Sequence, residues 1–157
     1  RLTAHLRTKI DMPGVEVWTS TLERTRATAR RLPWKSFPLK ALDEIDAGRC
    51  DGLTYAEVAA RMPEEYAARQ RDKLRYRYPR GESYLDVIQR LDPLIGDLER
   101  VTEPLVIVGH QAILRVLYGY LTDKPLQEIP HLSIPLHTVI ELTPIAYGAL
   151  EERVPLT

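Results

Sequence analysis

The sequence has a single cysteine, no net charge and no long apolar run. Because Cys50 cannot form an internal disulfide, a reducing compartment is favoured, and we expect a cytosolic protein. Basic and acidic residues are balanced at 22 each, which argues against general attraction to nucleic acids or membrane surfaces. No apolar stretch is long enough to cross a bilayer. These absences leave the functions of an ordinary globular domain open.

Common signatures of metal, nucleotide and serine-hydrolase sites are also absent. The sequence has no zinc-ligand cluster, no glycine-rich phosphate loop and no nucleophile elbow. Its 157 residues, 44% hydrophobic and 28% charged, suffice for one hydrophobic core, and nothing indicates a second. We therefore expect one domain over residues 1–157.

Strand-like and helix-like patterns alternate along the chain. Strands are expected over residues 15–19, 39–42 and 105–108, and a closing hairpin over residues 137–142 and 149–154. Helices are expected over residues 2–10, after Thr54, from Pro63, over residues 83–100 and from Gln111. This alternation predicts an α/β fold, a three-layer sandwich whose mainly parallel sheet has helices on both faces.

Two details concern the first third of the chain. The pattern Ser20-Thr-Leu-Glu23 predicts a capping box that opens a helix ending near Leu32. The first residue is Arg1, and the helical pattern that follows it has no capping residue. We therefore expect that the chain begins inside an element and that the domain is incomplete at its N-terminus.

His110 occupies the most informative position in the sequence. It follows the apolar run Leu105–Val108, predicted to be a buried strand, and Gly109, and it precedes a helical pattern that begins at Gln111. The carboxyl ends of strands in open α/β sheets are where ligands bind. A lone histidine there could simply bond a neighbouring loop, but Gln111 and Arg115 beside it favour an anion site.

Two further places could contribute chemistry. Arg24 follows the first strand, where a guanidinium could reach a phosphate, although taken alone it could equally be a solvated arginine. The loop Asp43-Glu44-Ile-Asp46 could supply a proton donor, because a carboxyl group beside a phosphate resists ionisation. The alternative for this loop is a polar turn.

A basic segment spans residues 69–80. It contains five arginines and one lysine against one acid, and it is interleaved with tyrosines. A solvated basic face or an RNA-stacking surface are alternatives, but a neutral chain makes RNA a minor one. A pocket for a doubly phosphorylated small molecule fits better, because several cations converge and phenols can bind sugar hydroxyls.

Taken together, these segments resemble the histidine phosphatase superfamily, and more narrowly the bisphosphatase domain of 6-phosphofructo-2-kinase/fructose-2,6-bisphosphatases. The resemblance covers nearly the whole chain. The segments that carry it are Val17-Trp-Thr-Ser20 with Arg24-Thr25, Leu42–Gly48, Tyr76–Tyr84, Gly109–Ala112 and Pro135-Leu-His-Thr138.

The resemblance implies hydrolysis of the 2-phosphate of fructose 2,6-bisphosphate through a phosphohistidine, without metal or cofactor. By position, Glu44 matches the general acid, His110 the second active-site histidine and Arg24 a phosphate clamp. The residues that match substrate contacts are Tyr55, Arg69, Lys73, Tyr84, Gln111 and Arg115. ATP is implied only if a kinase domain lies upstream in the same polypeptide, and no nucleic-acid or membrane partner is implied.

One family feature is missing from the printed sequence. The nucleophilic histidine of the family lies in an Arg-His-Gly motif on a first strand, and none of the 157 residues form that motif. Three readings follow: the distal part of a fructose-2,6-bisphosphatase whose first strand lies upstream, an inactive phosphosugar-binding pseudo-phosphatase, and a phosphoglycerate mutase-like or broad-specificity phosphatase. We expect the first, with this chain inactive alone.

Overall fold

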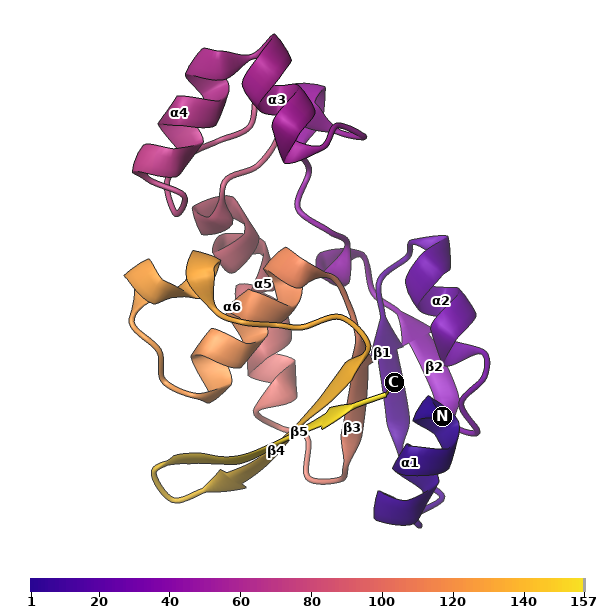
Figure 1. Cartoon of the computed structure of the whole chain (residues 1–157). Helices are drawn as coiled ribbons and strands as arrows, with labels where there is room; N and C mark the ends of the chain where they lie inside the picture. Colours follow the sequence, from indigo (N-terminus) through magenta and orange to yellow (C-terminus); the bar gives the residue numbers. More distant parts are fainter. Residues whose placement is uncertain (157) are drawn as a thin grey trace.

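The computed structural model describes residues 1–156, in which a parallel sheet lies between two layers of helices (Figure 1). The sheet has the order β2-β1-β3, and both pairings are parallel. Its strands are β1 (Glu16–Thr19), β2 (Lys35–Pro38) and β3 (Leu105–Val108). A two-stranded antiparallel hairpin is formed by β4 (Thr138–Ile145) and β5 (Gly148–Pro155), as the pattern of the last 20 residues predicts.

Alternate side chains of β1 enter opposite layers. Val17 is fully buried in a cluster with Leu6 of α1 (Leu2–Lys9) and Ala29 of α2 (Glu23–Ala29). Trp18 enters the other cluster, against α5 (Tyr84–Leu98) and α6 (Gln111–Leu121). Because successive strand residues point to opposite faces, one short strand organises both cores. This arrangement confirms the predicted three-layer α/β fold.

The larger core is built on α5 and α6. The N-cap Ser83 and Asp86 close a capping box at the start of α5, and the helix continues through Pro93 without a break. Val87 and Leu91 of α5 are completely buried. The buried residues of α6 are Ala112, Ile113, Val116, Leu117 and Gly119, at the spacing of one helical face.

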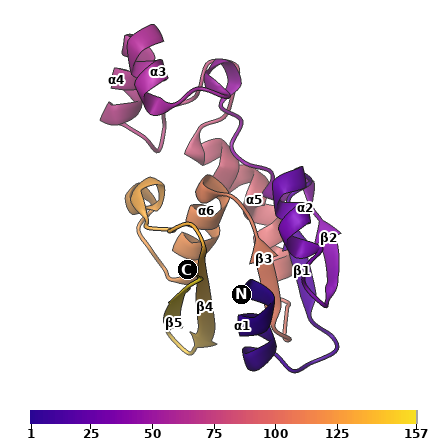
Figure 2. The same cartoon turned by 45° about the vertical axis from the view of Figure 1, so that its right-hand side comes forward.

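Two short helices project beyond the sheet and beyond the ends of α5 and α6 (Figures 1 and 2). They are α3 (Tyr55–Arg61) and α4 (Pro63–Arg71). A capping box of Thr54 and Glu57 opens α3, and Pro63 is in the first turn of α4. Three 3₁₀ helices complete the described chain: η1 (Lys40–Leu42), η2 (Gly48–Cys50) and η3 (Leu126–His131).

Three local predictions were wrong. Leu22, not Ser20, is the N-cap of α2, no side chain caps it, and the helix ends at Ala29. The strand expected over residues 39–42 lies earlier, in β2, and residues 40–42 form η1. The side chains of β3 are only half-buried, because β3 pairs with β1 alone within residues 1–156. In the same residues, every helix is too short or too polar to cross a membrane.

Candidate active site

His110 lies at the carboxyl end of β3, as the N-cap of α6, and contacts the end of β1. Its Nε2 is 2.7 Å from the Oγ of Ser20, and its Nδ1 is 3.2 Å from the Nε of Arg24. Ser20 follows β1 directly, and Arg24 is in the first turn of α2. The parallel pairing of β1 with β3 brings these three residues together although they are far apart in the sequence.

Arg24 determines which ring nitrogen of His110 carries the hydrogen. A guanidinium can only donate, so Nδ1 of His110 accepts from Arg24, and Nε2 carries the hydrogen that is donated to Ser20. Burial, reinforced by Arg24 and opposed by Asp43, lowers the pKa of His110 to about 4. His110 is therefore neutral at pH 7. Its Nε2–H, which bonds Ser20 in this structure, is the hydrogen that His110 can donate to an incoming phosphoryl group.

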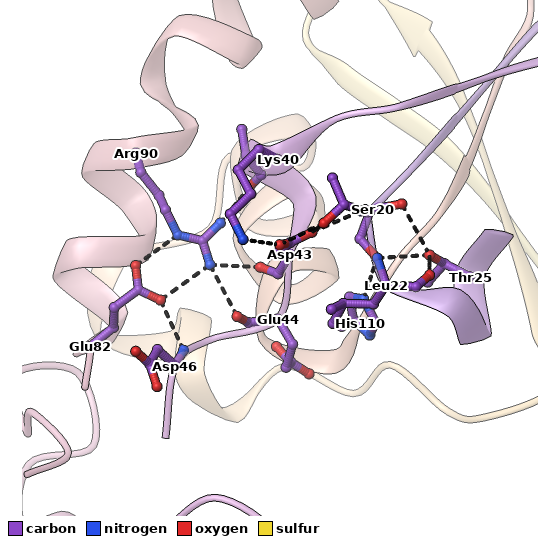
Figure 3. Close-up of polar contacts among 12 residues, drawn as sticks. Ser20, Leu22, Thr25, Lys40, Asp43, Glu44, Asp46, Glu82, Arg90 and His110 are labelled. Atoms are coloured by element: carbon purple, nitrogen blue, oxygen red, sulfur yellow. Dashed lines mark hydrogen bonds and ion pairs between the residues drawn. The ribbon is translucent and has the colours of Figure 1, made fainter. Parts of the chain in front are cut away.

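The loop that carries Glu44 is held by Arg90 of α5 (Figure 3). Arg90 donates to the carbonyls of Ala41 and Asp43, and it forms a two-bond ion pair with Glu82. On the other side of the loop, the Asp43 carboxylate accepts from the backbone N–H and the hydroxyl of Thr21. Glu44 is thus placed between the Arg90 cluster and the His110 cluster.

Burial raises the pKa of the Glu44 carboxyl. The backbone N–H groups of Ile45 and Ala112 and the nearby charges of Arg24 and Arg90 oppose that shift but do not cancel it. A carboxyl group with a raised pKa that lies near an anion site is suited to donate a proton. The catalytic role expected of Glu44 stays a prediction.

An open pocket of about 530 Å³ lies between the projecting helices and the body of the fold. This volume is in the range of small-molecule sites. Seven residues singled out from the sequence line it: Glu44, Tyr55, Arg69, Lys73, Tyr84, Gln111 and Arg115. Glu44 lines the pocket and is also near Arg24. His110 and Arg24 lie beside the pocket and do not line it.

Three cations converge in this pocket. Burial, followed by the charges of Arg115 and Arg69, lowers the pKa of Lys73 to about 8. Tyr84 accepts a hydrogen bond from Nη1 of Arg115, and its ring faces the Lys73 ammonium at 5.9 Å. A bound dianion would relieve the mutual repulsion of these cations, so the cluster is suited to a phosphate group.

Tyrosines orient Arg69. Its guanidinium lies 4.7 Å from the ring centroid of Tyr55, and its Nε donates to the hydroxyl of Tyr78 at 3.0 Å. Tyr78 lines the pocket but was not among the predicted site residues, and neither was His131. The tyrosines interleaved in the basic segment were the available signal for Tyr78. His131 had none, because its place depends on how η3 packs against α6.

The sequence is similar to known proteins of one family. A family model described as "Histidine phosphatase superfamily (branch 1)" matches residues 1–154. A 6-phosphofructo-2-kinase/fructose-2,6-bisphosphatase from Arabidopsis thaliana is 57% identical over 146 residues, 91% of this chain and 19% of that protein. A fructose-2,6-bisphosphatase from Saccharomyces cerevisiae is 55% identical over 86% of this chain and 30% of its own length. The chain thus spans between a fifth and a third of these relatives.

Solved structures share the fold at lower identity. A mycobacterial glucosyl-3-phosphoglycerate phosphatase in complex with inorganic phosphate has a TM-score of 0.75 at 23% identity, over 99% of this chain and 82% of that chain. The alpha-ribazole phosphatase from Shigella flexneri has a TM-score of 0.72 at 23% identity, over 85% of this chain and 69% of its own. The family model and the close relatives together establish that this chain belongs to the histidine phosphatase superfamily, branch 1.

Proposed function

We propose that this chain forms the proton-donating and sugar-binding part of a fructose-2,6-bisphosphatase. The observation that carries the proposal is the single pocket in which three cations, four tyrosines and Glu44 converge beside His110. The two relatives described above, which carry fructose-2,6-bisphosphatase in their names, support the choice of substrate. The substrate has two phosphates, which matches one anion site at Lys73 and another at His110.

In this proposal the 6-phosphate binds to Arg69, Lys73 and Arg115. The tyrosine hydroxyls and Gln111 then bind the sugar, and the 2-phosphate lies towards His110 and Arg24. Such a pose would place the C2 oxygen near Glu44, because Glu44 lies between the pocket and His110. Charge-assisted contacts to the 6-phosphate would fix the position of the reacting end.

The reaction proceeds in two steps. A histidine nitrogen attacks the phosphorus of the 2-phosphate, and the bond between phosphorus and the oxygen on C2 breaks. Glu44 donates its proton to that departing sugar oxygen. Water then attacks the phosphohistidine, with Glu44 as the base, which releases phosphate and restores the histidine. Neutral His110 and cationic Arg24 stabilise the transferring phosphoryl group.

The phosphorylated histidine of this proposal belongs to an Arg-His-Gly segment, a motif that the 157 residues do not contain. The chemistry in the described pocket uses side chains alone, and ATP would enter only through a kinase domain in the same polypeptide. Fructose 6-phosphate, its bisphosphate and inorganic phosphate are the proposed small-molecule partners, and the cytosol is the proposed place of action.

Binding of fructose 6-phosphate to the 157-residue chain tests the sugar site directly. We expect saturable binding of one molecule per chain by calorimetry, and a loss of at least tenfold in affinity in Lys73→Ala, since a charged contact is removed. Lys124→Ala is the matched control, because Lys124 is exposed and lies outside the pocket. Equal affinity for 3-phosphoglycerate would favour a mutase-like or broad-specificity phosphatase. Binding that Lys73→Ala leaves unchanged would refute the pocket assignment.

A further inference from the structure

The backbone segment of residues 130–134 contacts the pocket in an unusual way. Residues 130 and 131 end η3, residues 132–134 belong to no helix or strand, and within residues 1–156 the segment pairs with no strand. The carbonyls of Pro130, Leu132 and Ile134 accept hydrogen bonds from pocket side chains, and the carbonyl of Ser133 accepts from Arg153 of β5. The donors to these four carbonyls are therefore side chains and not the backbone of a neighbouring strand.

Each of the three pocket-facing carbonyls holds a different side chain. Pro130 accepts from Nζ of Lys73 at 2.8 Å, Leu132 from Nε of Arg115 at 2.8 Å, and Ile134 from Nε2 of Gln111. These bonds use one donor of each side chain. Lys73 keeps two N–H donors and Arg115 keeps others on its guanidinium, so both remain free to bind an anion.

The bonds matter because the cations repel one another. Lys73 and Arg115 are close enough for electrostatic repulsion between them. Without an acceptor each would extend towards solvent, and a ligand would have to order it at an entropic cost. The carbonyls hold the charged ends in place before the ligand arrives.

The segment is itself fixed by packing against α6. Pro130 and Ile134 are buried, and Ile129 packs over Gly119, one helical turn beyond Arg115. A Cβ built on Gly119 would lie 2.8 Å from Cγ1 of Ile129 and 3.2 Å from Cδ1 of Leu132. A Cβ at 119 therefore forces the side chains of Ile129 and Leu132, which pack the segment against α6, to shift.

We propose that residues 130–134 form a positioning element for the phosphosugar pocket, and that Gly119 is the residue whose small size sets its distance from the pocket. The carbonyls of Pro130, Leu132 and Ile134 preorganise Lys73, Arg115 and Gln111. This inference rests on the proposed function for the identity of the ligand, fructose 6-phosphate. The hydrogen bonds themselves do not depend on it.

Gly119→Ala is the test variant, and Gly96→Ala is its matched control. Both glycines lie inside helices, but a Cβ on Gly96 meets nothing within 4 Å. Calorimetry with fructose 6-phosphate should show roughly tenfold weaker binding in Gly119→Ala, the size expected when charge-assisted hydrogen bonds lose their alignment. Gly96→Ala should bind like the parent chain, and the melting temperature of each variant checks that it is folded.

A compensating change separates positioning from general damage. Ile129→Ala removes the atom that a Cβ at 119 would meet, so the double variant should bind more tightly than Gly119→Ala alone. Equal affinity of the parent, Gly119→Ala and Gly96→Ala would overturn the inference, as would a double variant that binds no better than Gly119→Ala.

A measurement without ligand keeps the two proposals distinguishable. The Nε–H of Arg115 is hydrogen-bonded to Leu132, so its hydrogen exchange, followed by NMR, should be slow in the parent and faster in Gly119→Ala. If the parent does not bind fructose 6-phosphate but this difference is seen, the proposed function fails and the positioning element stands. If exchange is equally fast in the parent and in Gly119→Ala, the positioning element is refuted whatever the chain binds.

Discussion

Binding of a sugar phosphate should be coupled to protonation of Lys73 above neutral pH. With a pKa of about 8, Lys73 is about three quarters neutral at pH 8.5 and about one tenth neutral at pH 7. A phosphate dianion beside it favours the ammonium form and should restore the pKa towards its ordinary value. Lys73 should therefore take up about 0.7 proton on binding at pH 8.5 and about 0.1 at pH 7, and affinity should fall up to about tenfold per pH unit above 8.

Calorimetry in two buffers with different ionisation enthalpies measures this uptake. At pH 8.5 the ligand adds no proton of its own, because the second pKa of a phosphate monoester is about 6. At pH 7 it releases about 0.1 proton on binding as the dianion, which offsets the uptake by Lys73. Tyr78 and Tyr84 also line the pocket, but burial raises their pKa values, so both stay neutral over this range. Lys73→Met should abolish the uptake, and Lys124→Met, at an exposed residue outside the pocket, should leave it unchanged. Proton uptake that persists in Lys73→Met, or is absent in the parent at pH 8.5, would refute the lowered pKa of Lys73 as its source.

Three further predictions concern Glu44, Ser20 and Leu91. Burial raises the pKa of Glu44, so the ionised carboxylate destabilises the fold at pH 7. Glu44→Gln should therefore unfold at a higher urea concentration than the parent at pH 7, and this gain should disappear as the pH falls to 4. A gain in stability that is independent of pH would contradict the raised pKa. Ser20→Ala leaves the buried Nε2–H of His110 without its acceptor and should cost about 1–3 kcal/mol of unfolding free energy in urea titrations, and no loss would mean that the bond contributes nothing. Leu91→Ala removes a fully buried side chain and should lower the free energy of unfolding by about 2–5 kcal/mol. Leu126 is exposed, so Leu126→Ala should change it by less than about 0.5 kcal/mol. Similar losses in both variants would contradict the assigned core.

The residues of the pocket could be predicted because their sequence segments are distinctive. Tyr84 ends a segment that carries the family resemblance, and Lys73 lies in the basic segment 69–80. The structure brings them together with Gln111 and Arg115. The network around them could not be predicted. Arg90 lies on a helix face with ordinary spacing, and only the fold shows that it holds the Glu44 loop.

The wrong local predictions have physical causes. Ser20 fits a capping box in sequence, but His110 and Thr25, which fold back against it, bond its hydroxyl instead. The apolar residues Leu39 and Leu42 suggested a strand, yet β1 pairs with residues 35–38 and η1 buries Leu42 in the larger core. Local patterns cannot include contacts with residues far along the chain.

The most direct test of the central claim is the hydrolysis of fructose 2,6-bisphosphate by the full-length polypeptide that contains these 157 residues. We expect that kcat/KM for phosphate release from the 2-position exceeds that for 3-phosphoglycerate and for p-nitrophenyl phosphate, and that acid quenching traps a phosphohistidine. Preference for either of the other substrates, or turnover without a phosphoenzyme, would contradict it.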